Sequence, residues 1–121
     1  MLGIVVTTTN VFYARRFADP LYKTVGEIVG GGIEIVHPRG LEQPFCMIVN
    51  DEGLLQGLPA NPLGCALYET WRHGSPIVGD IVLMKIGYRN GDRDVIGLSD
   101  EEAVSIVKQL EVYGLKEKEG E

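Results

Sequence analysis

VGGGIE at residues 29–34, MIVNDEG at 47–53 and GLPAN at 57–61 are the stretches that decide the fold of this chain. The first predicts a helix that ends at glycine and leads into a strand, because glycine accepts the left-handed conformation that closes a helix. The second predicts a buried strand followed by a tight acidic turn at 51–53. In the third, Asn61 stands before a proline, which is a typical helix start. Loops are dense here, and small proteins place binding sites on loops.

The same signals, followed outward, divide the whole chain into elements. Apolar runs bounded by turn residues predict strands, and apolar residues at helical spacing predict helices. The strands are expected near 2–9, 33–37, 45–50, 54–58 and 80–86, and the helices near 20–29, 63–72 and 100–113. This order predicts an α+β fold, with a mixed or antiparallel sheet flanked by two to three helices. We expect a single domain at residues 1–114 and a charged tail at 115–121 with the composition of a disordered segment.

Local capping signals set the helix boundaries. Asp19 precedes Pro20 and is predicted to cap the first helix, which Gly30 ends. Ser99 and Glu102 have the spacing of a capping box, and Gly114 is predicted to end the last helix.

Two further segments are less defined by pattern. Residues 10–18 either extend the first strand or form a second strand across a turn at Asn10. Residues 88–97 are polar and rich in turn signals, with Asn90-Gly91 the strongest, and are predicted to be a loop.

Charge restricts the class of partner. The 121 residues include 11 basic and 17 acidic side chains, a formal net charge of −6. Sequence-independent nucleic-acid binding requires a basic face, and no basic block is present, so no nucleic-acid partner is expected. Arg15-Arg16 and Arg72-His73 still allow one small anionic ligand. No basic leader and no apolar run of ~20 residues is seen, so we expect a cytoplasmic protein without a membrane partner.

Groups capable of catalysis are scattered through the sequence. Cys46 and Cys65 have no partner at metal-binding spacing and are predicted to be reduced thiols. His37 and His73 are predicted to be a strand-end and a helix-end residue, with a general base or a metal pair as the alternative. The sequence therefore predicts no enzyme, no catalytic residue, no metal and no cofactor.

Two local groups have both a structural and a functional interpretation. Asp51, Glu52 and Asp80 are predicted to be exposed turn carboxylates, and a divalent-cation site is the alternative. Trp71, the sole tryptophan, stands beside Arg72 at the end of a predicted helix. It either packs in the core or forms a stacking platform next to a phosphate-binding arginine.

The chain resembles a family of short domains of unknown function found in bacteriophages, prophages and gut bacteria. The motifs that carry the resemblance are Val29-Gly30-Gly31 with Ile33-Glu34, Asn50-Asp51-Glu52-Gly53, Leu58-Pro59-Ala60-Asn61 and Gly79-Asp80-Ile81-Val82. Their order and spacing match over about residues 22–86.

The resemblance implies a phage setting, in which small oligomeric proteins blunt host immunity by sequestering nucleotide messengers. It suggests a counter-defence protein of the host bacterial cytoplasm that binds a nucleotide-derived immune signal without cleaving it. Such a pocket needs phosphate donors, an aromatic face and amides that read polar edges. The candidates are Arg15, Arg16 and Arg72 for phosphate, Tyr68 and Trp71 for stacking, and Asn50 and Asn61 for polar edges.

Two other functions stay open. One is a protein-interaction module that inhibits a host or phage protein through an exposed sheet edge. The other is a hydrolase or lyase of nucleotide signals, with His37 or His73 as its base. A homo-oligomer is expected in addition, because the core of so short a chain is small and its first strands are apolar on both faces.

Overall fold

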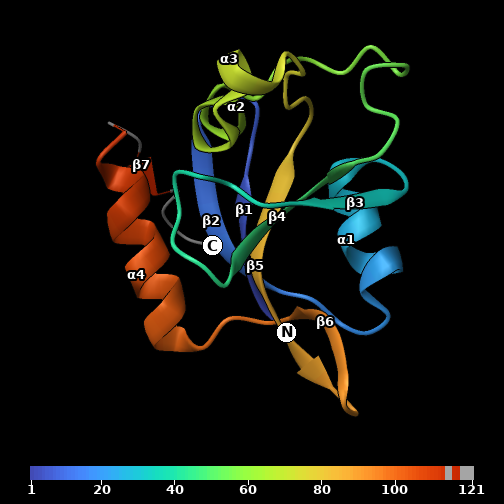
Figure 1. Ribbon diagram of the computed structural model, residues 1–121, viewed down its shortest axis with the longest axis vertical. Coiled ribbons are helices and arrows are strands. Elements are labelled where there is room, and N and C mark those ends of the chain that lie inside the picture. The colour runs from blue at the N-terminus through green and yellow to red at the C-terminus, as the bar shows by residue number, and fades with distance from the viewer. Residues whose placement is uncertain (114–115, 118–121) are drawn as a thin grey trace.

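The fold is a curved sheet with helices on both of its faces (Figure 1). The computed structural model describes residues 1–113 and the backbone of 116–117, and it describes His73 by its backbone alone. The strands are β1 (Leu2–Val6), β2 (Val11–Arg16), β3 (Ile33–Val36), β4 (Phe45–Asn50), β5 (Ile81–Arg89), β6 (Asp92–Ile96) and β7 (Lys116–Glu117). The helices are α1 (Leu21–Val29), α2 (Pro62–Tyr68), α3 (Thr70–His73) and α4 (Asp100–Glu111).

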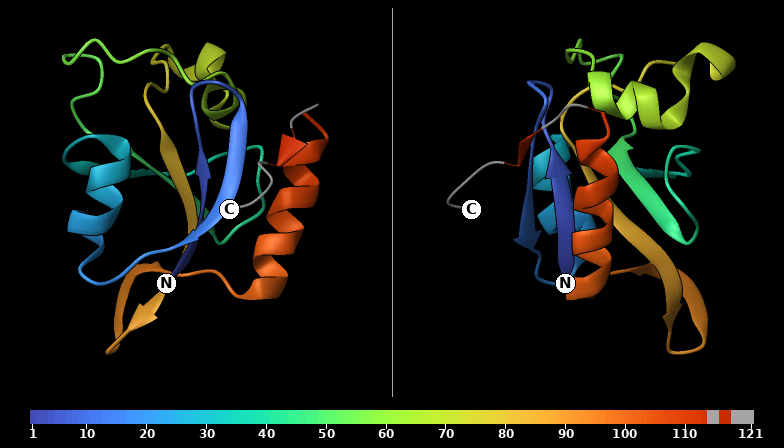
Figure 2. Two further views of the ribbon diagram at one scale, coloured as in Figure 1. Left: turned by 180° about the vertical axis from the view of Figure 1, so that it is seen from behind. Right: turned by 90° about the vertical axis from the view of Figure 1, so that its left-hand side faces the viewer.

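The strand order along the sheet is β3-β4-β5-β1-β2-β7, and β6 pairs with the extended end of β5. Strands β1 to β6 pair antiparallel, whereas the short β7 pairs parallel with β2. Helices α1 and α4 lie on opposite sides of the strands (Figures 1 and 2). The α+β class predicted from the sequence is confirmed. No helix in the described part of the chain is long and apolar enough to cross a membrane.

Alternation along the central strands divides the core in two. In β4, Phe45 and Met47 face a cluster that includes residues of α2 and α4, whereas Cys46 and Ile48 face a cluster that includes residues of α1. All six residues of β4 are buried, because both faces of the strand are covered. The faces of β1 are covered in the same way within a single chain, so they do not require a second copy to bury them. The predicted homo-oligomer stays a prediction.

Most of the predicted helix caps are present. Gly30 ends α1 with φ of 92°, and the Asn61 side chain accepts a hydrogen bond from the Gly64 N–H at the start of α2. Ser99 and Glu102 form the full capping box of α4. The prediction for Asp19 is wrong: Pro20 holds the cap position of α1, and the Asp19 carboxylate instead pairs with Arg89 at 3.0 Å. That long-range ion pair is not visible in the local sequence.

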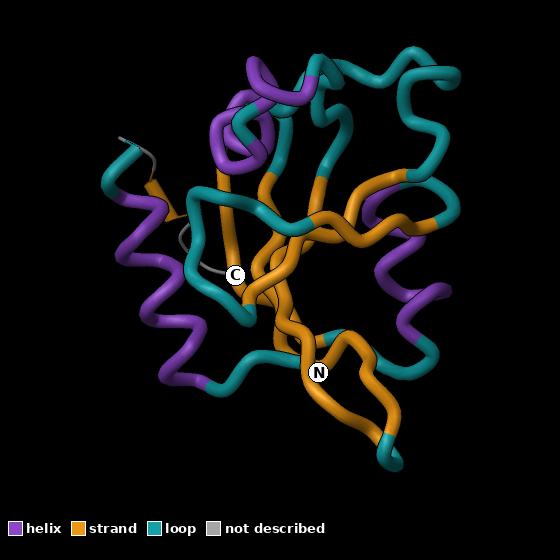
Figure 3. The backbone as a smooth tube through the Cα atoms, in the orientation of Figure 1, coloured by secondary structure: helices purple, strands orange, loops and turns teal. Residues whose placement is uncertain are grey.

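The sequence misplaced three further features. The segment 54–58 belongs to the long loop after β4 (Figure 3) and is not a strand. Residues 54–57 form turns, in which Gln56 N–H donates to the Glu52 carbonyl and Leu58 N–H to that of Gly53. The predicted helix 63–72 is divided into α2 and α3 at Glu69, which has φ of 58°.

The predicted loop 88–97 contains β6, which forms a hairpin with β5. Asn90 and Gly91 make its turn with φ of 51° and 85°, the conformation that twists two strands together. Of the two alternatives for residues 10–18, the second strand is correct, and Asn10 turns the chain with φ of 64°. The predicted helix end at Gly114 lies outside the described residues. So does the tail 115–121, apart from the backbone of β7.

Candidate functional site

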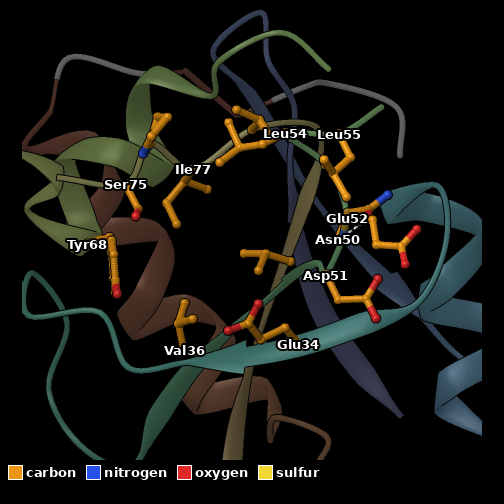
Figure 4. A pocket seen from close by; sticks show the side chains of 14 residues that line it. Glu34, Val36, Asn50, Asp51, Glu52, Leu54, Leu55, Tyr68, Ser75 and Ile77 are labelled. Carbon is orange, nitrogen blue, oxygen red and sulfur yellow. Dashed lines mark hydrogen bonds between the residues drawn. The ribbon is translucent and has the colours of Figure 1, made fainter. Parts of the chain in front are cut away.

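The loop that follows β4 forms one side of a cleft of about 430 Å³ (Figure 4). Figure 4 shows Asn50, Asp51 and Glu52 on one side of this cleft and Tyr68 and Ser75 on the other. We call it the acidic cleft. Its lining residues are Glu34, Val36, Val49, Asn50, Asp51, Glu52, Gly53, Leu54, Leu55, Tyr68, Ser75, Pro76, Ile77 and Val78.

Asn50 holds one wall of the acidic cleft in place. Its amide nitrogen donates to the Val29 carbonyl and to Gln56 Oε1, both at 3.0 Å, and its amide oxygen accepts from Glu52 N–H at 2.7 Å. The side chain is buried and joins the end of α1 to the turn after β4. The hydrogen-bonding groups of Asn50 are therefore engaged within the protein. Asn50 was predicted to contact a ligand, and here it stabilises the fold.

The charge of the acidic cleft is negative. Glu34, Asp51 and Glu52 are exposed, and within the described residues none of their carboxylates lies within 4.0 Å of a cationic side chain. The carboxylate of Asp51 lies over Gly32, where a Cβ atom would meet Asp51 Oδ2 at 2.6 Å. The described residues contain no cluster of three or more metal-ligating side chains that could hold an ion. An anionic ligand would be repelled from this cleft.

A second concave region has the opposite charge. Two open depressions of about 600 and 300 Å³ share His37 and Gln43 in their linings. Arg39 and Arg72 line the larger depression, and Arg93 lines the smaller. We call this surface the basic groove and define it by its polar residues His37, Arg39, Gln43, Glu69, Arg72 and Arg93.

The basic groove is built where the loop after β3 docks on α2. Gly40 N–H donates to the Leu67 carbonyl at 3.0 Å, and a Cβ at Gly40 would meet Leu67 Cα at 3.2 Å. Glycine is needed for this close approach of loop and helix. The far end of the loop is fixed by Ile86 N–H, which donates to the Pro44 carbonyl at 2.9 Å.

The cations of the basic groove are only partly neutralised. Arg72 Nε lies 3.3 Å from Glu69 Oε1, so its terminal nitrogens stay available. Arg39 and Arg93 have no carboxylate within 4.0 Å in the part of the chain that the structure describes. Lys85, which pairs in register with Phe45 of the larger depression, is bound to Glu102 at 2.6 Å. Free positive charge is thus concentrated at the arginines.

The predicted site residues are distributed over several places. Tyr68 and Asn50 line the acidic cleft, and Arg72 lines the basic groove. Trp71 neighbours Arg72 in α3 and is 70% exposed, so the core-packing interpretation of the indole is wrong.

The remaining three candidates lie elsewhere. Arg15 sits over the Phe17 ring at 5.3 Å, and Arg16 lies 3.6 Å from Asp100. Both belong to β2, and three strands separate β2 from β3 in the sheet. Asn61 is completely buried and donates to the carbonyls of Val6 and Gly79, both at 3.0 Å. Its amide oxygen accepts the capping hydrogen bond from Gly64 N–H at the start of α2.

The two cysteines lie in different environments. Burial raises the pKa of Cys46 to about 11, although a backbone hydrogen bond at Met84 acts in the opposite direction, so this thiol stays protonated at neutral pH. Cys65 is half-buried, and its sulfur accepts a hydrogen bond from Ile77 N–H at 3.3 Å. Both cysteines are free, as predicted.

Arg39, Arg93 and Gln43 were missed by the sequence analysis. Arg39 follows a proline in a loop and Arg93 stands between two aspartates, so neither has a local basic pattern. Only the docking of the loop and the β5–β6 hairpin bring them near His37.

The geometry defines a small α+β domain with an acidic cleft and a basic groove on neighbouring loops. The chain belongs to the family described as "Domain of unknown function (DUF3846)", whose profile matches residues 1–111. The expectation of an uncharacterised domain family is confirmed, while the phage setting and the motif pattern stay predictions. A search of curated proteins found no significant match, and neither did a search of solved structures.

Proposed function

We propose that this protein binds a small nucleotide-derived signalling molecule in the basic groove and holds it without cleaving it. The observation that carries the proposal is the grouping of Arg39, Arg72 and Arg93 around His37 in a chain of net charge −6. Arginine suits this task because its planar fork donates two hydrogen bonds to one phosphate.

Charge decides between the two concave regions. The acidic cleft has three carboxylates without a cationic partner among the described residues, whereas the basic groove has two arginines without a carboxylate partner. A phosphate loses much of its hydration on binding and needs cations to compensate for that loss. We therefore assign the phosphate role to Arg72 together with Arg39 and Arg93, and no longer to Arg15 or Arg16.

Trp71 supports the choice of a nucleotide as the ligand, because its indole can stack on a base. Its indole is largely exposed and belongs to the same short helix as Arg72. An exposed indole costs free energy in water, and stacking on a base recovers part of it. Gln43, which lines both depressions, takes over the role of reading polar edges, since Asn50 and Asn61 are engaged in internal hydrogen bonds.

In a phage setting, the ligand would be an immune messenger and the protein a counter-defence factor. Sequestration requires tight binding and slow release but no chemistry. Preformed loop sites meet this requirement, because little ordering is needed when the ligand binds. Backbone hydrogen bonds fix the loop at 37–44 near its middle, at Gly40, and at its end, at Pro44, which supports such a preformed site.

A thermal-shift screen against cyclic dinucleotides, cyclic trinucleotides and ADP-ribose derivatives tests the proposal. Saturation at ~100 times Kd adds about 2.7 kcal/mol to the free energy of unfolding, so a true ligand should raise Tm by several degrees. Arg39→Ala and Arg72→Ala should each weaken the binding by about tenfold or more. Arg15→Ala is the matched control and should leave it unchanged, because Arg15 lies on β2 outside the groove.

Heating the loaded protein separates binding from catalysis. A binder releases its ligand intact, whereas a hydrolase or lyase with His37 as base releases product. The absence of any shift across the screen, or equal losses in the Arg15 and Arg39 variants, would contradict the proposal.

A further inference from the structure

Strand β3 forms one edge of the sheet (Figure 1). Within the described residues it pairs with β4 alone, so its other side faces no strand. Natural proteins protect such edges with prolines, bulges or charges, because an open edge can pair with another chain. β3 reads Ile33-Glu34-Ile35-Val36, contains no proline, and has Glu34 as its one charged residue.

The register shows which backbone groups are free. Asp51 N–H donates to the Gly32 carbonyl at 3.0 Å, so Gly32 and Asp51 form a hydrogen-bonded pair. Such pairs alternate in an antiparallel ladder, which makes Glu34 and Val36 the next residues that bond to β4. Ile33 and Ile35 therefore point their N–H and C=O groups away from β4, toward the open edge.

The two faces of this edge have different chemistry. Glu34 and Val36 line the acidic cleft. Ile33 and Ile35 lie on the opposite face, where they line a mainly apolar hollow of about 340 Å³ together with Tyr22 of α1. The Asp19–Arg89 ion pair and Asp94 also line this hollow. Ile35 is 40% exposed and Tyr22 is 70% exposed. A strand added beside β3 would meet carboxylates on one face and apolar side chains on the other.

Charge complementarity identifies the occupant. Glu34, Asp51 and Glu52 carry three negative charges without a cationic partner in the described chain. A second copy of this protein paired through β3 would bring two such groups together, and like charges on neighbouring strands are destabilising. Basic side chains on the incoming strand would neutralise them.

We propose that the β3 edge is the docking site for an extended segment of a partner protein in which basic residues alternate with apolar residues. The segment adds one strand to the sheet through the free groups of Ile33 and Ile35. Its basic side chains enter the acidic cleft beside Glu34, and its apolar side chains cover Ile33 and Ile35. This site is distinct from the basic groove and does not depend on the ligand proposed there.

The test uses a short capped peptide of alternating valine and lysine, labelled for fluorescence anisotropy, with a valine–glutamate peptide as its counterpart. We expect saturable binding of the lysine peptide and none of the glutamate peptide. Glu34→Gln should weaken binding roughly two- to fivefold, as expected for one exposed ion pair. Glu101→Gln, at an exposed position in the first turn of α4, is the matched control and should leave binding unchanged.

N-methylated peptides distinguish strand addition from simple charge attraction. In antiparallel docking, the valines lie opposite Ile33 and Ile35 and donate their N–H groups to them, so N-methylation of the valines should weaken binding more than tenfold. N-methylation of the lysines should leave it intact, because those N–H groups face solvent. Equal binding of the two methylated peptides would overturn the proposal. A dimer of the free protein, measured by light scattering and abolished by Ile35→Lys, would also overturn it, because a second copy would then occupy the β3 edge.

Discussion

The acidic cleft and the basic groove meet at the end of β3, yet they carry opposite charge. Glu34 and Val36 of β3 line the cleft, and His37, the next residue, lines the groove. α2 and its continuation also contribute to both, with Tyr68 in the cleft and Glu69 and Arg72 in the groove. The net charge of −6 therefore describes neither site. What matters for binding is which side chains two neighbouring loops bring together.

The largest expected effect concerns α2, which lines the acidic cleft through Tyr68 and holds the loop of the basic groove through Leu67. Asn61→Ala removes the α2 cap and leaves the carbonyls of Val6 and Gly79 without their donor in a fully buried position. We expect the free energy of unfolding to fall by about 2–4 kcal/mol. Urea unfolding measures it. Ser99→Ala, which removes an exposed cap, should cost only about 1 kcal/mol, and equal losses would contradict the buried role of Asn61.

Two glycine substitutions should disturb the two sites separately. In Gly40→Ala the new Cβ approaches Leu67 Cα at 3.2 Å and pushes the 37–44 loop from α2, which affects the basic groove. In Gly53→Ala it approaches Val78 Cγ2 at 2.5 Å, which affects the acidic cleft. Each should lower the free energy of unfolding by about 1–3 kcal/mol. Amide chemical shifts should change in the groove for the first variant and in the cleft for the second. Identical chemical-shift changes in the two variants would show that a displacement at one site is transmitted to the other.

The fluorescence of Trp71 can report on ligand binding near the basic groove, because Trp71 neighbours Arg72. It is the only tryptophan, so intrinsic fluorescence reports on it alone. A nucleotide identified in the screen should quench this fluorescence, and Trp71→Ala should weaken binding by about 1–3 kcal/mol while changing stability by less than about 0.5 kcal/mol. Tyr68→Ala, in the acidic cleft, should not weaken it. If the tyrosine variant loses more affinity than the tryptophan variant, the ligand lies in the cleft.

The smallest effect concerns the ion pair between Lys85 and Glu102, which does not line the basic groove. Burial alone would raise the pKa of Glu102, but hydrogen bonds from Lys85 and Ser99 outweigh it and hold that pKa below its usual value. The resulting stabilisation is present above the pKa of the unfolded chain and is lost as pH falls through the lower folded pKa. Glu102→Gln should therefore cost about 0.5–1 kcal/mol at neutral pH, and the difference from the parent should shrink as the pH falls below the ordinary pKa of a glutamate. A difference that persists in acid would assign the cost to the capping box instead.

Local sequence determined the elements whose cause lies within a few residues. Gly30, Asn61 and the pair Ser99–Glu102 mark helix ends by hydrogen bonds that span three or four positions, and their patterns predicted them. The apolar run of β4 predicted a buried strand, and all six of its residues are buried. These features follow from propensity and periodicity alone.

Tertiary structure decided the features whose partners are distant in the chain. Strand β6 is too polar to be recognised alone and exists because β5 supplies its hydrogen bonds, and Asp19 pairs with Arg89 instead of capping α1. The basic groove has the same origin: its arginines come from a loop, a short helix and a hairpin that meet only in the folded chain. Charge acts through space and falls off within about 10 Å, so the sequence could give the number of charged residues but not the place where they converge.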